Sequence, residues 1–431
     1  MPRPRLGRPR RASIQALRMK TLIIGLNWLG DVIMSFPALS LASTIASPDA
    51  LEFRNGQPHA THSPNSSQTN QMDSMGSDVI DIPRPPCVNP GLDVSYPDET
   101  QTVDILTRPN LGSLYFLHPG VQRIHVLPSA HFSTALLPQL KKLRALKYRK
   151  IIIFPRSLRT ALLAFLIGAP ERIGYAGEGR SFLLTRAIPL PHHLKSFHET
   201  RLHAHLVQAA FNPSSSQAAD SSQEKSFFSR KDPLEVNLRV PTQEAVETVR
   251  SRYGILGGRQ YAVFAPGAAF GPAKRWPAER FAELARRLAE ETGLCVIATG
   301  SSAEADLTAT TVAECRRILP HSAIDLGGKT PLPDLISLLS GASLLVSNDS
   351  GTMHLGAALG IPTIVIVGST DMARTGPLGH RHRIVQGDSC VPPCRQKTCS
   401  RGDYRCLTTI SAEAVFSHAK NLLFTGTTCK I

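Results

Sequence analysis

The sequence lacks several features that would assign it to a common class. It has no run of eighteen or more apolar residues, and its first residues contain no apolar stretch like that of a secretion signal. We therefore expect a soluble, cytoplasmic protein. The HExxH, Walker lysine and GxSxG motifs are also missing, which argues against zincins, P-loop NTPases and serine hydrolases.

Aromatic residues are scarce, and acidic residues are outnumbered by basic ones. Aromatics make up 6% of the 431 residues, and the formal net charge is +15. The surplus lies on residues 102–431, since the six arginines of residues 1–18 are offset by the acidic stretch 47–101. A basic body suits an anionic partner such as a nucleotide or an acidic lipid headgroup. We do not expect nucleic acid, because no basic stripe is interleaved with Tyr or Phe for base stacking.

Half of the eight cysteines crowd into one segment, as Cys390, Cys394, Cys399 and Cys406. In a reducing compartment such a cluster favours a metal site or free thiols over disulfides. The spacing is not the paired C-x2-C of common zinc modules. A structural metal cluster and free thiols therefore both stay open.

The order of short apolar runs indicates the fold class. Runs at 21–24, 103–106, 124–127 and 151–154 alternate with helical stretches, and the alternation restarts with runs at 261–264, 294–297, 343–346 and 363–367. Such alternation predicts parallel sheets covered by helices on both faces. We expect an α/β protein with two doubly wound, Rossmann-like domains facing across a cleft.

Composition places the boundaries of these domains. Residues 1–18 read as a basic disordered leader, and 47–95, rich in Ser, Asn, Pro and Gln, as a disordered insertion in an N-terminal domain that spans 19–211. The polar segment 212–235 predicts a linker. Residues 236–431 form the predicted C-terminal domain.

The most informative motif runs from Asp349 to His354, where a buried strand passes into a helix. A helix N-terminus presents unpaired N–H groups, and Ser350, Gly351 and Thr352 add hydroxyls and close backbone access. This pattern predicts an anion site for a diphosphate. The alternative is that Asp349 or Ser350 merely caps the helix. His354 stays a candidate because of its neighbours, although a lone histidine is more often structural.

Two further loops follow strands of the C-terminal half. In the loop from 266 to 277, Gly267 and Ala268 allow backbone to approach a ligand, and Lys274 can place a cation against a leaving phosphate. A surface turn with ordinary basic residues is the alternative. Glu304, after the next strand, is either a ribose contact or a first-turn acid.

The N-terminal half offers one candidate base and one candidate anion site. Asp31 ends a glycine-bounded loop that does not match the dinucleotide fingerprint, and a carboxylate there could deprotonate a sugar hydroxyl. It could equally be a helix acid favoured by the dipole. Ser157 and Arg159 are weaker candidates for holding an anionic acceptor, with solvated arginines as the alternative.

Taken in order, the motifs resemble those of a known family. Trp28-Leu29-Gly30-Asp31, the loop from Pro266 to Pro277 and the run from Ser347 to His354 resemble the bacterial lipopolysaccharide heptosyltransferases of glycosyltransferase family 9. The resemblance implies a GT-B enzyme that transfers heptose from ADP-L-glycero-D-manno-heptose to the first heptose of a lipid A–Kdo–heptose acceptor, with inversion. It implies no required cofactor and no catalytic metal.

The resemblance also implies roles for the candidate residues. Asp31 would be the base, and Lys274 with the backbone from Ser350 to Met353 would balance charge on the leaving ADP. The C-terminal domain would hold the nucleotide and the N-terminal domain the acceptor, at the cytoplasmic face of the inner membrane. The leader and the insertion are foreign to the family.

Two alternatives remain at this stage. One is another member of family 9 that adds the first or third heptose. The other is a non-enzymatic zinc- or nucleic-acid-binding protein built on the cysteine segment.

Overall fold

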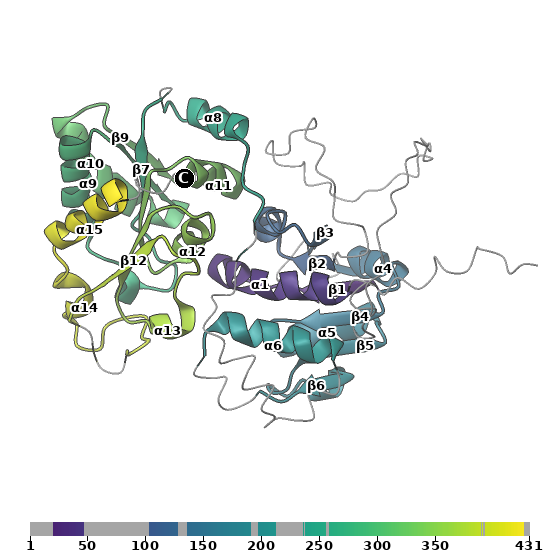
Figure 1. Ribbon diagram of the computed structural model, residues 1–431. Helices are drawn as coiled ribbons and strands as arrows, with labels where there is room; N and C mark the ends of the chain where they lie inside the picture. The colour runs from purple at the N-terminus through teal and green to yellow at the C-terminus, as the bar shows by residue number, and fades with distance from the viewer. Residues whose placement is uncertain are drawn as a thin grey trace, which may run out of the picture.

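The computed structural model describes residues 20–46, 103–127, 136–190, 197–212, 236, 238–255, 258–388, 390 and 393–425. The predicted leader, the predicted insertion and nearly all of the predicted linker lie outside these residues. Two domains make up the described chain, and they lie side by side in Figure 1. None of the described helices combines the length and the apolar character needed to cross a membrane.

The N-terminal domain is built on a parallel sheet with the strand order β3-β2-β1-β4-β5-β6. Its strands are β1 (Thr21–Ile24), β2 (Val103–Thr107), β3 (Val121–Val126), β4 (Lys150–Ile153), β5 (Glu171–Tyr175) and β6 (Arg186–Ile188). Its helices are α1 (Leu29–Ala46), η3 (Pro109–Leu111), α3 (Gly112–Tyr115), α4 (Leu137–Ala145), α5 (Leu158–Ile167), η5 (Ser181–Leu183) and α6 (Glu199–Phe211).

The C-terminal domain repeats this plan with the strand order β12-β11-β10-β7-β8-β9, again parallel throughout. Its strands are β7 (Tyr261–Ala265), β8 (Cys295–Gly300), β9 (Ala323–Gly327), β10 (Leu344–Asn348), β11 (Thr363–Val367) and β12 (His382–Gln386). Its helices are α8 (Gln243–Arg252), η8 (Pro272–Lys274), α9 (Ala278–Thr292), η9 (Ser302–Glu304), α10 (Ala305–Ile318), α11 (Leu332–Ser340), α12 (Gly351–Ala358), α13 (Met372–Thr375), α14 (Arg405–Thr408) and α15 (Ala412–Thr425).

The central strands are buried along their whole length, as continuous apolar runs require. All residues of β1, β4, β7, β10 and β11 are buried, and the runs Thr21–Ile24 and Thr363–Val367 consist mainly of Ile, Leu and Val. Strands covered by helices on both faces have this composition. The predicted fold class of two doubly wound α/β domains is therefore confirmed.

The strand orders locate where each domain can bind a ligand. In both sheets the first three strands are added toward one edge and the last three toward the other, so the strand order reverses between β1 and β4 and between β7 and β10. Ligands of doubly wound sheets bind outside the carboxyl ends of the strands at this switch point. The loops after β1 and β4 carry Asp31 and Ser157, and the loops after β7 and β10 carry Lys274 and Ser350.

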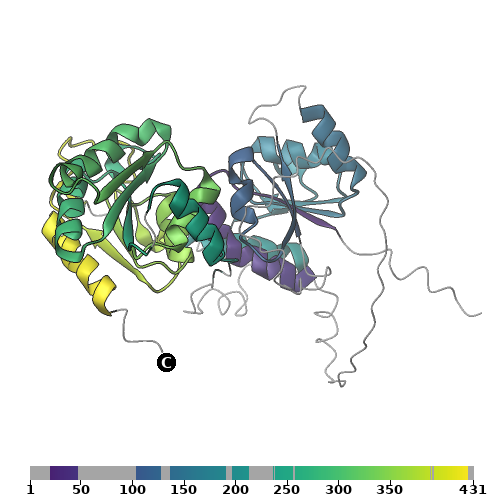
Figure 2. The same cartoon turned by 90° about the horizontal axis from the view of Figure 1, so that it is seen from above.

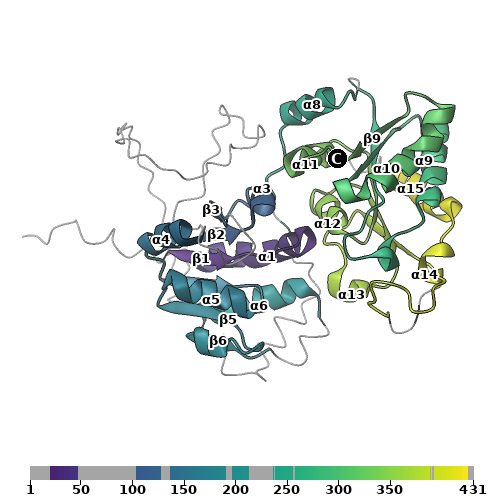
Figure 3. The ribbon, with the colours of Figure 1, turned by 180° about the vertical axis from the view of Figure 1, so that it is seen from behind.

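The two domains touch through the first turns of α1 and α12. A Cβ atom placed on Gly30 would lie 2.6 Å from Cδ2 of His354, and one on Gly351 would lie 2.8 Å from Cβ of Leu29. Figures 1 and 3 show α12 facing the end of α1, and in Figure 2 the purple α1 reaches toward the C-terminal domain. Both switch points therefore meet at this interface.

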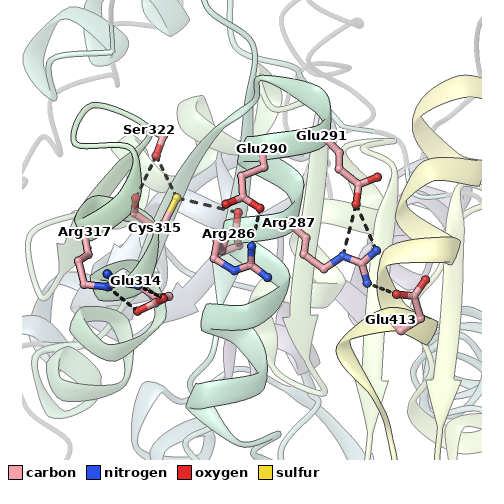
Figure 4. Close-up of polar contacts among 10 residues, drawn as sticks. Arg286, Arg287, Glu290, Glu291, Glu314, Cys315, Arg317, Ser322 and Glu413 are labelled. Carbon is pink, nitrogen blue, oxygen red and sulfur yellow. Dashed lines mark hydrogen bonds and ion pairs between the residues drawn. The ribbon is translucent and has the colours of Figure 1, made fainter.

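The outer face of the C-terminal domain is held by ion pairs on α9. Arg286 pairs with Glu290, and Arg287 pairs with both Glu291 and Glu413 of α15 (Figure 4). Pairs spaced i,i+4 on a helix contribute a few tenths of a kcal/mol each, about 0.2–0.5. The Arg287–Glu413 pair attaches α15 to α9. All of these pairs lie away from the interface between the domains (Figure 1).

Candidate active site

The centre of the candidate site is an ion pair between two predicted site residues. Nζ of Lys274 lies 2.7 Å from Oδ2 of Asp349, with the two side chains 17% and 5% exposed. Lys274 ends η8 after β7, while Asp349 follows β10, so neighbouring strands supply the two charges. A buried charge needs such a partner, because leaving it alone costs several kcal/mol, roughly 3–5.

Asn348 fixes the loop that carries Lys274. Its Oδ1 accepts a hydrogen bond of 3.0 Å from the Trp276 backbone N–H, and its Nδ2 donates one of 2.6 Å to the Pro266 carbonyl. Trp276, which is almost fully buried, donates through Nε1 to the Ile410 carbonyl at 3.1 Å. Both ends of the loop 266–276 are thereby bound to β10 and to the chain beyond α14. Asn348 lies within the run from Ser347 to His354, but the sequence pattern alone predicts no role for it.

The start of α12 keeps its N–H groups clear of its own side chains. Ser350 occupies the N-cap position with extended backbone but makes no side-chain capping bond, and its hydroxyl lies 3.1 Å from that of Ser347. The alternative that Ser350 caps the helix is therefore wrong. The backbone N–H groups of Gly351, Thr352 and Met353 start the helix, which is the arrangement that binds anions.

His354 lies buried one residue further along α12. Burial lowers the pKa of its imidazole to about 4, with Lys274 and His198 acting in the same direction and Asp349 against them. The ring is therefore neutral at neutral pH, and its Nδ1 has no hydrogen-bond partner among the described residues. His354 supplies a neutral polar edge, not a positive charge, between α12 and Gly30.

Glu304 serves in a capping box and also lies against the loop after β7. Its Oε2 accepts from the Ser301 backbone N–H at 2.9 Å and from the Ser301 hydroxyl at 2.7 Å. A Cβ atom on Gly267 would fall 2.2 Å from the Glu304 carboxyl carbon, so glycine is needed at that position. The neighbouring Ala268 is buried, and its carbonyl accepts from Nε of Arg275 at 3.1 Å. The first-turn interpretation of Glu304 is confirmed, and its ribose contact stays a prediction.

Asp31 lies on the opposite side of the interface, in the first turn of α1. The pKa of its carboxyl is raised to about 6, chiefly by burial and then by the negative charge of Glu199, while Lys274 acts against both. In the part of the chain that the structure describes, no hydrogen bond or ion pair reaches this carboxylate. A carboxylate with a pKa near neutral and no partner is suited to accept a proton.

Behind Asp31, the buried Tyr115 supports the loop after β1. Its hydroxyl accepts from the Leu26 backbone N–H at 3.1 Å, and a Cβ atom on Gly25 would come within 2.3 Å of that oxygen. Burial raises the pKa of Tyr115, and the charge of Asp31 adds to this. The phenol therefore remains protonated and neutral beside the carboxylate.

The predicted acceptor residues lie at the end of β4, next to β1. The Ser157 hydroxyl accepts from the Thr160 backbone N–H at 3.4 Å and so caps α5, while Arg159 is half-buried in the first turn. The fully buried Arg180 holds this loop by donating to the carbonyls of Pro155 and Tyr175. Their role in acceptor binding stays a prediction.

The cysteine segment packs against the donor side of the site. The Ala273 backbone N–H donates to the Lys397 carbonyl at 3.1 Å, and that of Arg395 donates to the Ser369 carbonyl at 2.9 Å. Among the described residues no three His, Cys, Asp or Glu side chains gather closely enough to hold a metal ion. Cys390, Cys394, Cys399 and Cys406 are free thiols in the structure, which offers no support for a structural metal cluster.

The fold and this site together correspond to one family of enzymes. The model of glycosyltransferase family 9 (heptosyltransferase) matches residues 138–405, more than half of the chain. The chain therefore belongs to glycosyltransferase family 9 and is a glycosyltransferase. This membership removes the alternative of a non-enzymatic zinc- or nucleic-acid-binding protein.

Individual relatives narrow the resemblance further. Lipopolysaccharide heptosyltransferase 2 of Escherichia coli K12 is 26% identical over 339 residues, which cover 77% of this chain and 92% of the relative. Lipooligosaccharide heptosyltransferase 2 of Haemophilus influenzae is 29% identical and covers 68% and 82%. The solved E. coli ADP-heptose LPS heptosyltransferase II shares the fold with a TM-score of 0.70 at 22% identity, over 95% of this chain and 99% of that one. The predicted GT-B fold and the resemblance to lipopolysaccharide heptosyltransferases are confirmed.

Proposed function

We propose that the protein transfers L-glycero-D-manno-heptose from ADP-heptose to the first heptose of the lipopolysaccharide inner core. The relatives with the highest coverage are heptosyltransferases 2, and the solved E. coli structure is that of an ADP-heptose LPS heptosyltransferase II. The observation that carries the chemistry is the position of the unpartnered Asp31 across the interface from the Lys274–Asp349 pair.

The C-terminal domain would hold the donor. The N–H groups at the start of α12 and the Lys274 ammonium supply positive charge where the diphosphate of ADP would lie. Asp349 keeps Lys274 in place before the donor binds. Another E. coli protein, heptosyltransferase WaaC, whose structure has been solved with ADP, shares the fold with a TM-score of 0.58 at 18% identity, over 94% of this chain and all of that one.

The N-terminal domain would start the reaction. Asp31 accepts the proton of an acceptor hydroxyl. The electron pair left on that oxygen then forms a bond to the anomeric carbon of the heptose. The bond from that carbon to the β-phosphate oxygen breaks, and ADP leaves with the electron pair. Attack from the face opposite to ADP inverts the anomeric centre. Positive charge from Lys274 and α12 balances the leaving group, so the step requires no cofactor or metal.

The acceptor would be the lipid A–Kdo–heptose core at the cytoplasmic face of the inner membrane. The +15 net charge suits a partner bearing phosphates and acidic sugars. Ser157 and Arg159 lie on the same sheet edge as Asp31 and are the proposed acceptor contacts, Arg159 through its charge. A peripheral location at that membrane would follow from the acceptor.

The position of transfer is tested with two acceptors in parallel. ADP release from ADP-heptose is measured with a core that ends in the first heptose and with one that ends before it. We expect turnover only with the core that ends in the first heptose. Turnover with the heptose-free core alone would overturn the proposal in favour of the first transfer, an activity suggested by the 32% identity over 145 residues to lipopolysaccharide heptosyltransferase 1 of Pseudomonas aeruginosa.

A further inference from the structure

A second ionic contact crosses the domain interface close to Asp31. The guanidinium of Arg374, on α13 of the C-terminal domain, lies 2.6 Å from Oε1 of Glu199, at the first turn of α6 in the N-terminal domain. Both side chains are about three-quarters buried. The pair is partly shielded from solvent, and its exposed fractions of 28% and 22% are somewhat smaller than the 32% and 34% of Arg286–Glu290 on α9.

Neighbouring contacts hold this pair in one geometry. His198 caps α6, with Nδ1 accepting from the Thr200 backbone N–H at 3.3 Å, and its Nε2 donates to the Gly376 carbonyl at 3.0 Å. That carbonyl follows directly after α13, so a neutral histidine binds the same two helices that the ion pair joins. The junction of α6 and α13 is thus bound at two points.

Asp31 is flanked by charged and titratable groups from several elements of both domains. Glu199 on α6 and Lys274 in η8 act on its carboxyl, and Tyr115 on α3 is close enough to respond to its charge. One step further out lie Asp349, which pairs with Lys274, His354, which contacts Gly30, and His198 and Arg374, which neighbour Glu199, with His203 and Arg156 beyond them. Of these, Glu199 is the carboxylate that raises the pKa of Asp31, next in size to burial itself.

We propose that Glu199 and Arg374 are positioning residues that set the proton affinity of Asp31 from opposite directions. The negative charge of Glu199 disfavours a second negative charge on Asp31, and Arg374 weakens that effect by neutralising Glu199. Because Arg374 belongs to the donor domain, this adjustment exists only where the two domains are in contact. The inference rests on the proposed role of Asp31 as the base.

The balance has a functional consequence near neutral pH. A base accepts a proton efficiently when its pKa lies just below the working pH, where it is ionised but still basic. Without Glu199 the carboxylate is a weaker base, and without Arg374 more of it is protonated. Neither partner touches the reacting atoms; each acts through Asp31.

The test is the pH dependence of kcat/KM for the acceptor at saturating ADP-heptose. Asp31 must be ionised, so the rate falls as the pH drops through its pKa. In Glu199→Gln this acidic limb should move to lower pH by about half a unit or more, and in Arg374→Gln to higher pH by a similar amount. The double variant should follow Glu199→Gln, because Arg374 acts through Glu199.

Controls separate this role from simple structural damage. Arg374→Lys keeps the charge and should restore the wild-type limb, while Arg252→Gln breaks a remote ion pair with Asp334 and should leave the limb in place. Thermal unfolding establishes that each variant is folded. The inference would be overturned if the acidic limbs of the pH profiles of Glu199→Gln and Arg374→Gln coincide with that of the wild type, or if both move in the same direction. An acidic limb and full turnover retained in Asp31→Asn would instead overturn the proposed base.

Discussion

The two switch points of this protein use their charged residues in opposite ways. In the C-terminal domain Lys274, Asp349 and Asn348 are already bound to one another or to the loop 266–276. In the N-terminal domain Asp31 is half-buried with a pKa of about 6 and without a partner among the described residues. A binding half is effective when its charges are arranged beforehand. A base must keep its charge uncompensated, so burying the Asp31 carboxylate without a partner lowers the stability of the fold.

The largest effect is expected from removing the reactive side of this contrast. Asp31→Asn should lower kcat at least about a hundredfold, the scale of general acid–base catalysis, and leave ADP-heptose affinity nearly unchanged. The measurement is turnover together with calorimetric donor binding. Asp306→Asn, which changes an exposed first-turn acid of α10, is the matched control. Near-normal turnover would return Asp31 to the role of a helix acid.

The same variant should be more stable than the wild type at neutral pH. A carboxyl whose folded pKa is raised binds more protons when folded, so the wild type loses stability as the pH rises from about 4 through about 6. Asparagine has no charge to desolvate. In urea unfolding, the free energy of unfolding of Asp31→Asn should exceed that of the wild type at pH 7.5. The two values should be equal below about pH 4. An unchanged free energy of unfolding at both pH values would contradict the buried charge.

Next in size is the loss of the cation on the prearranged side. Lys274→Ala should lower kcat/KM because about 3 kcal/mol of transition-state stabilisation is lost, a typical cost of one such donor. Lys141→Ala, on the exposed face of α4, should have no effect in the same assay. An unchanged rate constant in Lys274→Ala would mean that the ammonium serves Asp349 and not the donor.

A smaller effect is expected from loosening the loop 266–276. Asn348→Ala leaves the Trp276 N–H and the Pro266 carbonyl without their partner, which should lower the free energy of unfolding by about 2 kcal/mol. Donor affinity should fall with it. Asn348→Asp keeps the acceptor for Trp276 but buries an unpaired carboxylate against the Pro266 carbonyl, so denaturant titration should show a larger loss of stability than in Asn348→Ala. Full ADP-heptose affinity in both variants would show that Asn348 does not position Lys274.

The smallest effect concerns Glu304, whose capping and binding roles can be separated. Ser301→Ala breaks the capping box but leaves the carboxylate, and it should cost about 1 kcal/mol of stability with ADP affinity retained. Glu304→Gln should weaken ADP binding severalfold if the carboxylate contacts ribose. Equal ADP affinity in the two variants would leave Glu304 with its capping role alone.

Much of the fold was predictable because it depends on local patterns. The central strands, such as Thr21–Ile24 and Thr363–Val367, are continuous apolar runs and were placed within a residue or two. Four strands were not predicted: β5 and β6 of the first sheet, and β9 and β12 at the two edges of the second. Ala323–Gly327 and His382–Gln386 are only partly buried, so they carry polar residues and no apolar run.

The candidate site was predictable residue by residue but not in its contacts. The order of motifs pointed to Asp31, Lys274 and Ser350, since each follows a strand at the start of a helical turn. The pairing of Glu199 with Arg374 joins residues 175 positions apart in different domains. No local pattern reports such a contact.

The sequence by itself determined two doubly wound domains, membership in glycosyltransferase family 9 and the turn from Asp349 to His354 at the head of a helix, because apolar periodicity and motif order are local properties of the chain. Tertiary structure alone decided that Ser350 makes no cap, that Asp349 binds Lys274 and that Asp31 stands unpartnered beside Glu199. These outcomes depend on burial and on distances between the two sheets, which arise only when the domains meet.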